Sequence, residues 1–200
     1  MGKNAPCVVC LGYFDGVHKG HQKLLEAARQ AADARGIRVC AHTFDRAPGA
    51  KDFDLTTLEE REALLKAAGA DQVWVSAFDD GMRTMSGEDF FRHIVLDALN
   101  ARCVVCGDDH RFGYKGACGA GELKSMCEKA GIPLIVVPPV TLENGEKISS
   151  TAIRRALARG DSALAEQMLG RQVSDEMKAR AGTIYPNNGI DGNKTNPGKV

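Results

Sequence analysis

The chain has 200 residues, with 26 lysines and arginines against 26 aspartates and glutamates, so its formal net charge is zero. Hydrophobic residues make up 44% and the mean hydropathy is −0.24, values typical of a soluble globular domain. The balanced charge excludes the broad basic surface of a nucleic-acid-binding or membrane-binding protein. Neither a signal peptide nor an apolar run of about 20 residues is present, and the seven cysteines are expected to be free thiols. The sequence therefore predicts a cytoplasmic protein with no nucleic-acid or membrane partner.

Short apolar, β-rich runs alternate with helical patterns along most of the chain. Strands are expected in CVVCLGYF, IRVCAHTF, QVWVSAF, RCVVCGDD and IPLIVVPPV. Helices are expected from Lys19 to Arg35, in TTLEEREALLKAAG and SGEDFFRHIVLDAL, with Thr57 and Ser86 near their starts, and in AGELKSMCEKAG. ISSTAIRRALARG and DSALAEQMLG then read as two short helices. This alternation predicts an α/β domain with a doubly wound, parallel, five-stranded sheet.

The domain is expected to span residues 1–171. After Arg171 the periodicity fails, and the end of the chain is rich in glycine, asparagine and proline. Residues 172–200 are therefore predicted to be a partly disordered tail, with at most a frayed helix in SDEMKARAG.

Four conspicuous loops follow predicted strands: GYFDGVHKGH, TFDRAP, AFDDGMRTMSG and GDDHRFGYKG. Ligands of doubly wound sheets bind at the carboxyl ends of the strands, near the point where the strand order reverses. These loops are therefore predicted to line one binding site.

The segment HKGH lies where the first strand passes into the first helix. The free N–H groups of a helix start bind phosphate, and Gly20 lets the backbone approach a ligand. His18 and His21 can then hold a triphosphate and stabilise charge on a phosphoryl group. The alternatives are one capping and one surface histidine, or a metal pair, although no third ligand is near. The pattern favours phosphate chemistry.

A second helix start, ISSTAIRRAL, carries hydroxyls at Ser149, Ser150 and Thr151 and a guanidinium at Arg154. Together with the helix amides, these groups form a second candidate anion site. The alternative is an ordinary N-cap followed by a basic surface helix. The presence of HKGH in the same chain favours the anion site.

The segment GDDHRFGYKGACG places Asp108 and Asp109 directly after a strand, followed by aromatic residues and glycines. Such a loop suits a planar ligand, whereas the alternative is a turn in which aspartate bonds to its own backbone.

The spacing of Cys7 with Cys10, and of Cys103 with Cys106, resembles that of zinc ligands. Residues i and i+3 of a strand point to opposite faces, however, so buried thiols are expected and a zinc site is not. The single histidines His42 and His93 are expected to have packing or surface roles. The chain has neither GxGxxG nor GxxxxGK[ST], which argues against a dinucleotide fold and a P-loop kinase.

The segments GYFDGVHKGHQKLL, TFD..P, LTTLEEREALLKAAGADQVWVSAFDD, MSGEDFFRHIV, VVCGDDHRFGYKGACG and ISSTAIRRALARGDSALAEQMLGR occur in that order. In this series the chain resembles the FMN adenylyltransferase (FAD synthetase) module of bacterial bifunctional riboflavin kinase/FAD synthetases. The match runs from about Cys7 to Arg171. HxGH alone marks the wider nucleotidylyltransferase superfamily, whereas the whole series is specific to the flavin branch.

The resemblance implies a Rossmann-like nucleotidylyltransferase fold and the reaction of ATP with FMN to give FAD and pyrophosphate. It also implies Mg²⁺, without naming its ligands. By this resemblance His18, His21 and Arg154 are catalytic, and Ser150, Thr151 and Arg154 hold phosphates opposite the histidines. The other implied contacts to ATP or FMN are Gly12, Tyr13, Phe14, Asp15, Gly20 and Ser149, with Asp109, Arg111 and Phe112 toward the flavin.

The chain departs from the family pattern in three ways. Arg46 and Ala47 stand where a Pro-His-Pro-like run is usual, and His110 replaces an aromatic residue. No riboflavin kinase module follows Arg171, so a monofunctional enzyme that depends on a separate riboflavin kinase for FMN is expected. A sister nucleotidylyltransferase for another phosphorylated substrate, or a non-catalytic flavin or nucleotide sensor, remains the alternative.

Overall fold

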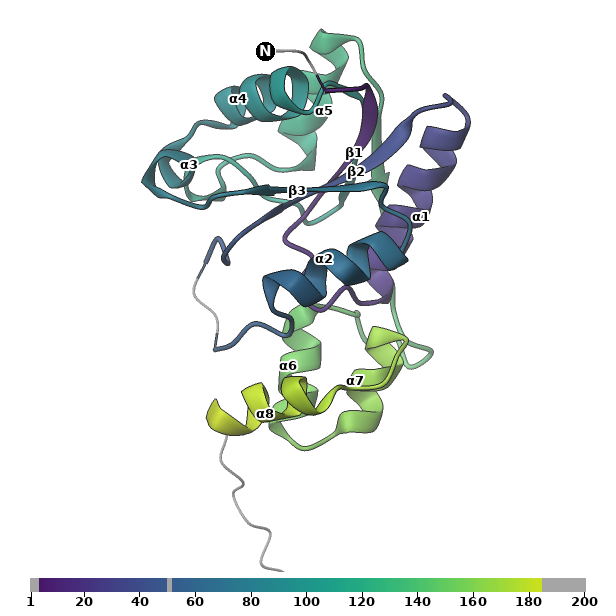
Figure 1. The fold of residues 1–200 in the computed structure, drawn as a ribbon, viewed down its shortest axis with the longest axis vertical. Helices are drawn as coiled ribbons and strands as arrows, with labels where there is room; N and C mark the ends of the chain where they lie inside the picture. The colour runs from purple at the N-terminus through teal and green to yellow at the C-terminus, as the bar shows by residue number, and fades with distance from the viewer. Residues whose placement is uncertain (1–3, 50–51, 185–200) are drawn as a thin grey trace, which may run out of the picture.

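Five parallel strands form the centre of the molecule in the computed structural model, which describes residues 4–49 and 52–184 (Figure 1). The sheet has the order β3-β2-β1-β4-β5. All neighbouring strands are parallel, as predicted. Because β1 lies between β2 and β4, the strand order reverses at the carboxyl end of β1. The strands are β1 (Cys7–Leu11), β2 (Arg38–Phe44), β3 (Gln72–Ser76), β4 (Ala101–Gly107) and β5 (Leu134–Val137).

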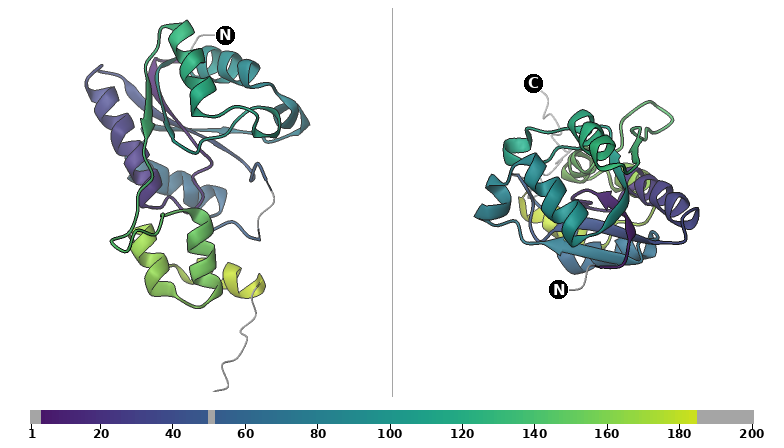
Figure 2. Two further views of the ribbon diagram at one scale, coloured as in Figure 1. Left: turned by 180° about the vertical axis from the view of Figure 1, so that it is seen from behind. Right: turned by 90° about the horizontal axis from the view of Figure 1, so that it is seen from above.

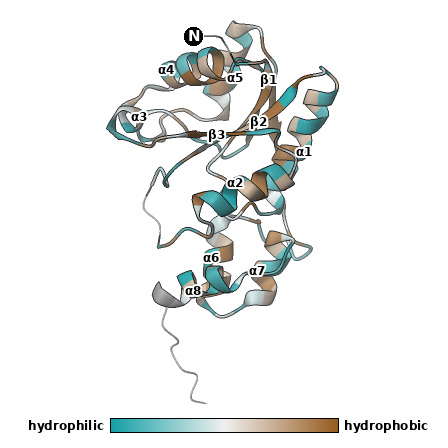
Figure 3. Ribbon diagram, viewed as in Figure 1, coloured by the Kyte–Doolittle hydropathy of each residue, from teal (hydrophilic) through white to brown (hydrophobic). Residues whose placement is uncertain are grey.

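Helices cover both faces of the sheet (Figures 1 and 2). On one face lie α1 (Lys19–Asp33) and α2 (Leu58–Ala67), and on the other lie α4 (Gly87–Asp89), its π-helical continuation η1 (Phe90–Ala98) and α5 (Ala120–Ala130). The central strands β1 and β4 place apolar side chains in the cores on both sides of the sheet. In Figure 3 the ribbon of β1 has the hydrophobic colour. This two-sided burial explains why the strand sequences are continuous apolar runs rather than alternating ones.

The cysteine pairs divide between the two faces of the sheet. Cys7 and Cys106 pack in the core beneath α5 and η1, whereas Cys10 and Cys103 pack in the core beneath α1. All four are buried free thiols, so the predicted geometry of the two pairs is confirmed.

Three further helices, α6 (Ser150–Ala158), α7 (Ser162–Leu169) and α8 (Asp175–Ile184), lie together below the sheet in Figure 1. Their apolar side chains form a third core, which includes Phe53 and Leu55 from the loop after β2. In the segment expected to be a tail, α8 instead packs into this core through Met177 and Ala181, which are 3% and 4% exposed. Val173, Met177 and Ala181 recur every four residues, so one helical face is apolar. The remainder of the expected tail, residues 185–200, lies outside the described residues.

Two short helices interrupt predicted loops. α3 (Asp80–Thr84) follows β3, with the Asp79 side chain accepting a hydrogen bond from the Met82 N–H at 2.8 Å, and η2 (Tyr114–Gly116) follows β4. The first and third strands end earlier than predicted, because GYF and AF leave the sheet. Within the described ranges, no helix combines the length and apolarity needed to span a membrane.

Candidate active site

The turn between β1 and α1 has an unusual backbone. Phe14 and Val17 have φ angles of 59° and 39°, in the left-handed region that non-glycine residues rarely adopt. Such conformations persist only where surrounding contacts hold them. The Phe14 ring is buried and lies so close to Gly12 that a Cβ there would be 2.9 Å from the ring, which explains the glycine.

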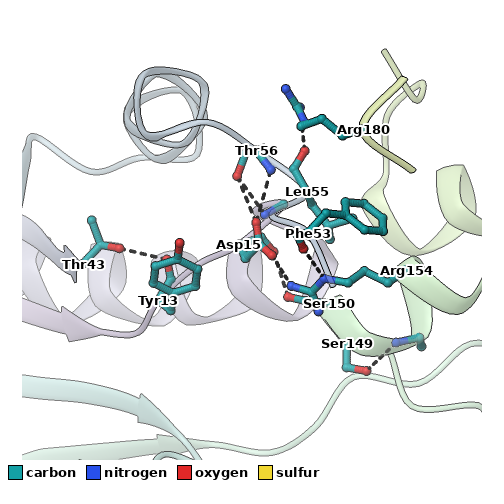
Figure 4. Close-up of polar contacts among 12 residues, drawn as sticks. Tyr13, Asp15, Thr43, Phe53, Leu55, Thr56, Ser149, Ser150, Arg154 and Arg180 are labelled. Carbon is teal, nitrogen blue, oxygen red and sulfur yellow. Dashed lines mark hydrogen bonds and ion pairs between the residues drawn. The ribbon is translucent and has the colours of Figure 1, made fainter. Parts of the chain in front are cut away.

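Neighbouring loops hold this turn by hydrogen bonds (Figure 4). The Thr43 hydroxyl donates to the Tyr13 carbonyl at 2.8 Å, and the Gly16 N–H donates to the Thr56 hydroxyl oxygen at 3.1 Å. The turn after β1 is therefore fixed to strand β2 and to the loop between β2 and α2.

His18 and His21 lie together at the start of α1. His18 is the N-cap, and its Nδ1 accepts the His21 N–H at 3.4 Å. The two rings stack with centroids 3.6 Å apart, and a Cβ on Gly20 would lie 3.0 Å from the His18 ring. Burial lowers the pKa of His18 to about 4, so the ring is neutral at pH 7. Since Nδ1 accepts, the proton of the neutral ring belongs on Nε2. His18 therefore caps the helix, as in the alternative interpretation of HKGH, and it also lines a cleft.

The N-termini of α1 and α6 open into one cleft of about 370 Å³, which we call the polar cleft. Its walls are the turn after β1, the loop after β4 and the segment from β5 to α6. At the start of α6, the Ser149 hydroxyl oxygen accepts the Ala152 N–H at 3.1 Å, and the Thr151 side chain is exposed. The described first turn of α1 carries no carboxylate. Two helix dipoles therefore favour an anion here.

Asp15 and Arg154 form a buried ion pair across this cleft, at 2% and 8% exposure (Figure 4). Arg154 Nε also donates to the Phe53 carbonyl at 2.7 Å. Asp15 Oδ1 accepts the Thr56 N–H at 3.2 Å, and the Ser150 hydroxyl donates to the Asp15 carbonyl at 2.8 Å. Arg154 and Ser150 were expected to grip phosphates. Although both line the cleft, the structure commits their polar groups largely to Asp15 and Phe53.

Asp109, expected toward the flavin, lies instead on the polar cleft. Its carboxylate pairs with Lys147 Nζ at 2.8 Å. Lys147 comes from the turn before α6, so the pair spans the mouth of the cleft.

A second cavity of about 590 Å³, the apolar pocket, adjoins the first. Its lining includes Phe44, Phe78, Phe90, Met82 and Phe112. Gly12, Tyr13, His110 and Arg111 line both cavities, so the two meet at these residues. Of the predicted contacts, Arg111 and Phe112 thus lie where a planar aromatic ligand would fit.

Two histidines adjoin the apolar pocket. His42 is buried with Nε2 2.9 Å from the Ser76 hydroxyl, and burial lowers its pKa to about 3. His110 stacks against Phe112 with centroids 5.7 Å apart, and burial lowers its pKa to about 4. Both rings are neutral at pH 7. His93 is exposed, as expected, whereas His42 lies on the pocket as well as in the packed interior.

Arg61, which is 1% exposed, is a residue of the site that the sequence pattern does not predict. Its Nη2 donates to the Phe44 carbonyl at 2.6 Å, and its guanidinium carbon lies 4.2 Å from the centre of the Tyr13 ring. Arg61 thereby supports the wall shared by the two cavities. A charged residue within an amphipathic helix gives no signal of this burial. In the part of the chain that is described, neither cavity is lined by Arg46, whose exposed side chain lies 3.5 Å from Asp45.

A parallel sheet with an HxGH turn and two helix N-termini around one cleft at its reversal point defines an α/β nucleotidylyltransferase-like protein. The chain belongs to the FAD synthetase family, whose model matches residues 1–152.

Two similar proteins support the assignment of the chain to this family. The bifunctional riboflavin kinase/FMN adenylyltransferases of Pseudomonas fluorescens and Bacillus subtilis are 34% and 33% identical over 82% and 84% of this chain. The matches cover 54% and 55% of those proteins, so the chain spans about half their length. The crystal structure of a macrolide-efflux protein from Streptococcus pneumoniae has a TM-score of 0.77 and 33% identity, over 86% of this chain and 58% of that one.

Proposed function

We propose that this chain transfers the AMP part of ATP to FMN, giving FAD and pyrophosphate. The observation that supports this most is the junction of two unlike cavities at Gly12, Tyr13 and His110. The polar cleft has the helix N-termini that a triphosphate needs, and the apolar pocket has aromatic walls suited to a flavin ring. FMN adenylyltransferase activity is part of the name of the similar proteins described above.

In the proposed reaction, a phosphate oxygen of FMN forms a bond to the α-phosphorus of ATP. The bond between that phosphorus and the oxygen bridging to the β-phosphate breaks, and pyrophosphate leaves. The protein aligns the two substrates across the junction and stabilises the negative charge that develops. In this proposal His18 donates from Nε2–H to a phosphate oxygen as a neutral imidazole, His21 lies stacked beside it, and the N-terminus of α1 faces the phosphates.

Mg²⁺ would neutralise charge on the triphosphate and the leaving pyrophosphate. The exposed carboxylates on the polar cleft are those of Asp108 and Asp109. Mg²⁺ is usually bound by one or two carboxylates together with substrate phosphates, so this donor set fits a cation that is held mainly by phosphate oxygens. Asp15 is a poorer ligand, since its carboxylate is buried against Arg154.

The test is to incubate the protein with ATP, Mg²⁺ and FMN and to measure FAD by chromatography and pyrophosphate by a coupled assay. A second reaction contains riboflavin in place of FMN. FAD from FMN alone supports the proposal, whereas no FAD and no flavin binding would point to a sister nucleotidylyltransferase. Phosphorylation of riboflavin would contradict the prediction that a separate riboflavin kinase supplies FMN.

The substitution His21→Ala distinguishes an enzyme from a non-catalytic flavin or nucleotide sensor. An enzyme loses kcat by at least about a hundredfold, because the charge of the transition state is no longer stabilised. A sensor loses only nucleotide affinity. His93→Ala is the control, since His93 is an exposed histidine on η1. A cytoplasmic location is proposed with this function, because the seven cysteines are all free thiols.

A further inference from the structure

Arg171, which follows α7, contacts the turn between β1 and α1. Arg171 Nη2 donates to the Gly16 carbonyl at 2.7 Å, and its Nη1 donates to the Val17 carbonyl at 3.3 Å. The contacts join positions more than 150 residues apart. Because the planar guanidinium offers its donors in a fixed fork, one side chain fixes the orientation of two successive carbonyls.

The turn that Arg171 holds has a strained backbone. Val17 has φ of 39°, which is unfavourable for a β-branched residue, and the next residue is His18. The Val17 carbonyl also accepts from Gln22 Nε2 at 3.0 Å, and the same amide nitrogen donates to the Leu169 carbonyl at 3.0 Å. The end of α7 is thus tied to the residue before His18 through both Gln22 and Arg171.

Arg171 also acts on His18 electrostatically. Its positive charge, half-buried beside the turn, lowers the pKa of His18, whereas the Asp109 carboxylate across the cleft raises it. The stacked ring of His21 is the third titratable neighbour. Burial remains the largest cause of the low pKa of His18, and Arg171 adds to it.

A second arginine fixes the neighbouring loop from the same side. Arg180, on α8, donates through Nη2 to the Leu55 carbonyl at 2.8 Å (Figure 4). The same nitrogen also donates to the Glu60 carboxylate at 2.9 Å. Leu55 precedes Thr56, which bonds to Asp15 and Gly16. The segment from Arg171 to α8 therefore supports the turn after β1, which lines the polar cleft, and the loop that bonds to Asp15 in that turn.

We infer that Arg171 is a positioning residue for the reaction proposed above: by holding the Gly16 and Val17 carbonyls it fixes the place of the His18 ring. This inference rests on the proposed function and adds a residue beyond the segment that the family model matches. Arg171 acts through the turn, because its donors are directed to main-chain carbonyls of the protein itself.

The test compares Arg171→Gln and Arg171→Lys with Arg29→Gln. Arg29 is a suitable control because its Nη2 also donates to a backbone carbonyl, that of Gly69 at 2.8 Å, at a place remote from the cleft. For each protein we would measure the folded fraction, kcat and KM for FAD formation, ATP affinity and the titration of His18 by NMR.

Arg171→Gln is expected to lower kcat by roughly tenfold to a hundredfold, since a displacement of about 1 Å has effects of that size, while KM for FMN changes less than about twofold. The pKa of His18 should rise in this variant. Arg171→Lys should keep the charge and give an intermediate kcat, because an ammonium group lacks the planar fork. Arg29→Gln should match the unmodified protein.

An unchanged kcat together with an unshifted His18 titration in Arg171→Gln would overturn the inference. A kcat that falls only in proportion to the folded fraction would overturn it as well. If Arg171→Gln does not fold, Arg171→Lys provides the test. A kcat of this variant equal to that of the unmodified protein would also overturn the inference. An unmodified protein that makes no FAD refutes the proposed function instead, and the His18 titration and ATP affinity then decide the inference alone.

Discussion

The guanidinium of Arg154 donates to the carboxylate of Asp15, and this buried pair joins α6 to the turn after β1. The two residues lie 139 positions apart in the chain, on the two helix N-terminal regions that face the polar cleft. Since Asp15 also accepts from Thr56 and Arg154 donates to Phe53, the pair connects the turn after β1, the loop between β2 and α2, and helix α6. The pair therefore fixes the start of α6 against the turn after β1 on the wall of the polar cleft.

Replacing Asp15 by Asn is predicted to lower the free energy of unfolding by about 3–5 kcal/mol, because the buried Arg154 charge loses its compensation. Urea unfolding measures the change. Asp33→Asn is the control, since Asp33 pairs with Arg29 on the surface and such pairs contribute about 1 kcal/mol or less. A loss below about 1 kcal/mol for Asp15→Asn would contradict the structural role of the pair.

Replacing Gly20 by Ala is predicted to separate activity from stability. The new Cβ would lie 3.0 Å from His18 Cε1 and 3.1 Å from Nδ1, so the ring must move. Alanine meanwhile favours the helix by up to about 1 kcal/mol, so thermal stability should not fall much. FAD formation should drop by about tenfold or more.

Gly121→Ala in α5 is the matched control, because a Cβ there meets nothing within 4 Å among the described residues. This variant should keep full activity. Equal activities of the Gly20 and Gly121 variants would show that the position of the His18 ring is not critical.

Stability is predicted to fall as the pH is lowered from 7 to 5. The pKa values of His18, His42 and His110 are lowered by burial to about 4, about 3 and about 4, from 6.5 in the unfolded chain. Below pH 6.5 the unfolded chain therefore binds protons that the folded protein does not. The stabilisation is complete above about pH 6.5 and is lost toward the folded values, at up to about 1.4 kcal/mol per pH unit for each histidine.

Urea unfolding at pH 7, 6 and 5 measures this dependence. His42→Gln removes one of the three histidines whose pKa is lowered by burial and should reduce the slope, whatever its effect on stability at pH 7. The same slope in both proteins would mean that His42 titrates alike in the folded and unfolded states.

Removing the Thr57 side chain is predicted to destabilise α2. Its hydroxyl oxygen accepts the Glu60 N–H at 3.2 Å, and the Glu60 carboxylate accepts the Thr57 N–H at 2.7 Å. Thr57→Ala should lower the free energy of unfolding by about 1 kcal/mol, and Thr57→Ser should restore most of it. Thermal unfolding of both variants tests the prediction, which fails if serine and alanine behave alike.

Much of the architecture follows from patterns that are local in the sequence. Continuous apolar runs separated by helices require a parallel sheet that is buried on both faces, and the helix N-cap at Thr57 is visible in four residues. The position of HKGH between the first strand and the first helix places His18 and His21 at a helix N-terminus. These predictions succeed because periodicity and capping depend on neighbours in the chain.

The apolar repeat that leads into α8 was also present in the sequence, at Val173 just before the helix and at Met177 and Ala181 within it, but three residues in a polar segment do not identify what they pack against. Only the third core, formed with α6, α7 and the loop after β2, makes that helix part of the fold.

The partners of the charged groups were decided by the tertiary structure. Arg61 beneath Tyr13, Arg154 on Asp15 and Arg171 on Gly16 join loops that are far apart in sequence. An arginine has the same local signature on a surface helix, on a phosphate or on a buried carbonyl. The sequence by itself determined which residue types reach the carboxyl edge of the sheet. Which of them face a ligand and which hold the site together depended on how the loops pack, because burial and hydrogen-bond geometry exist only after distant segments meet.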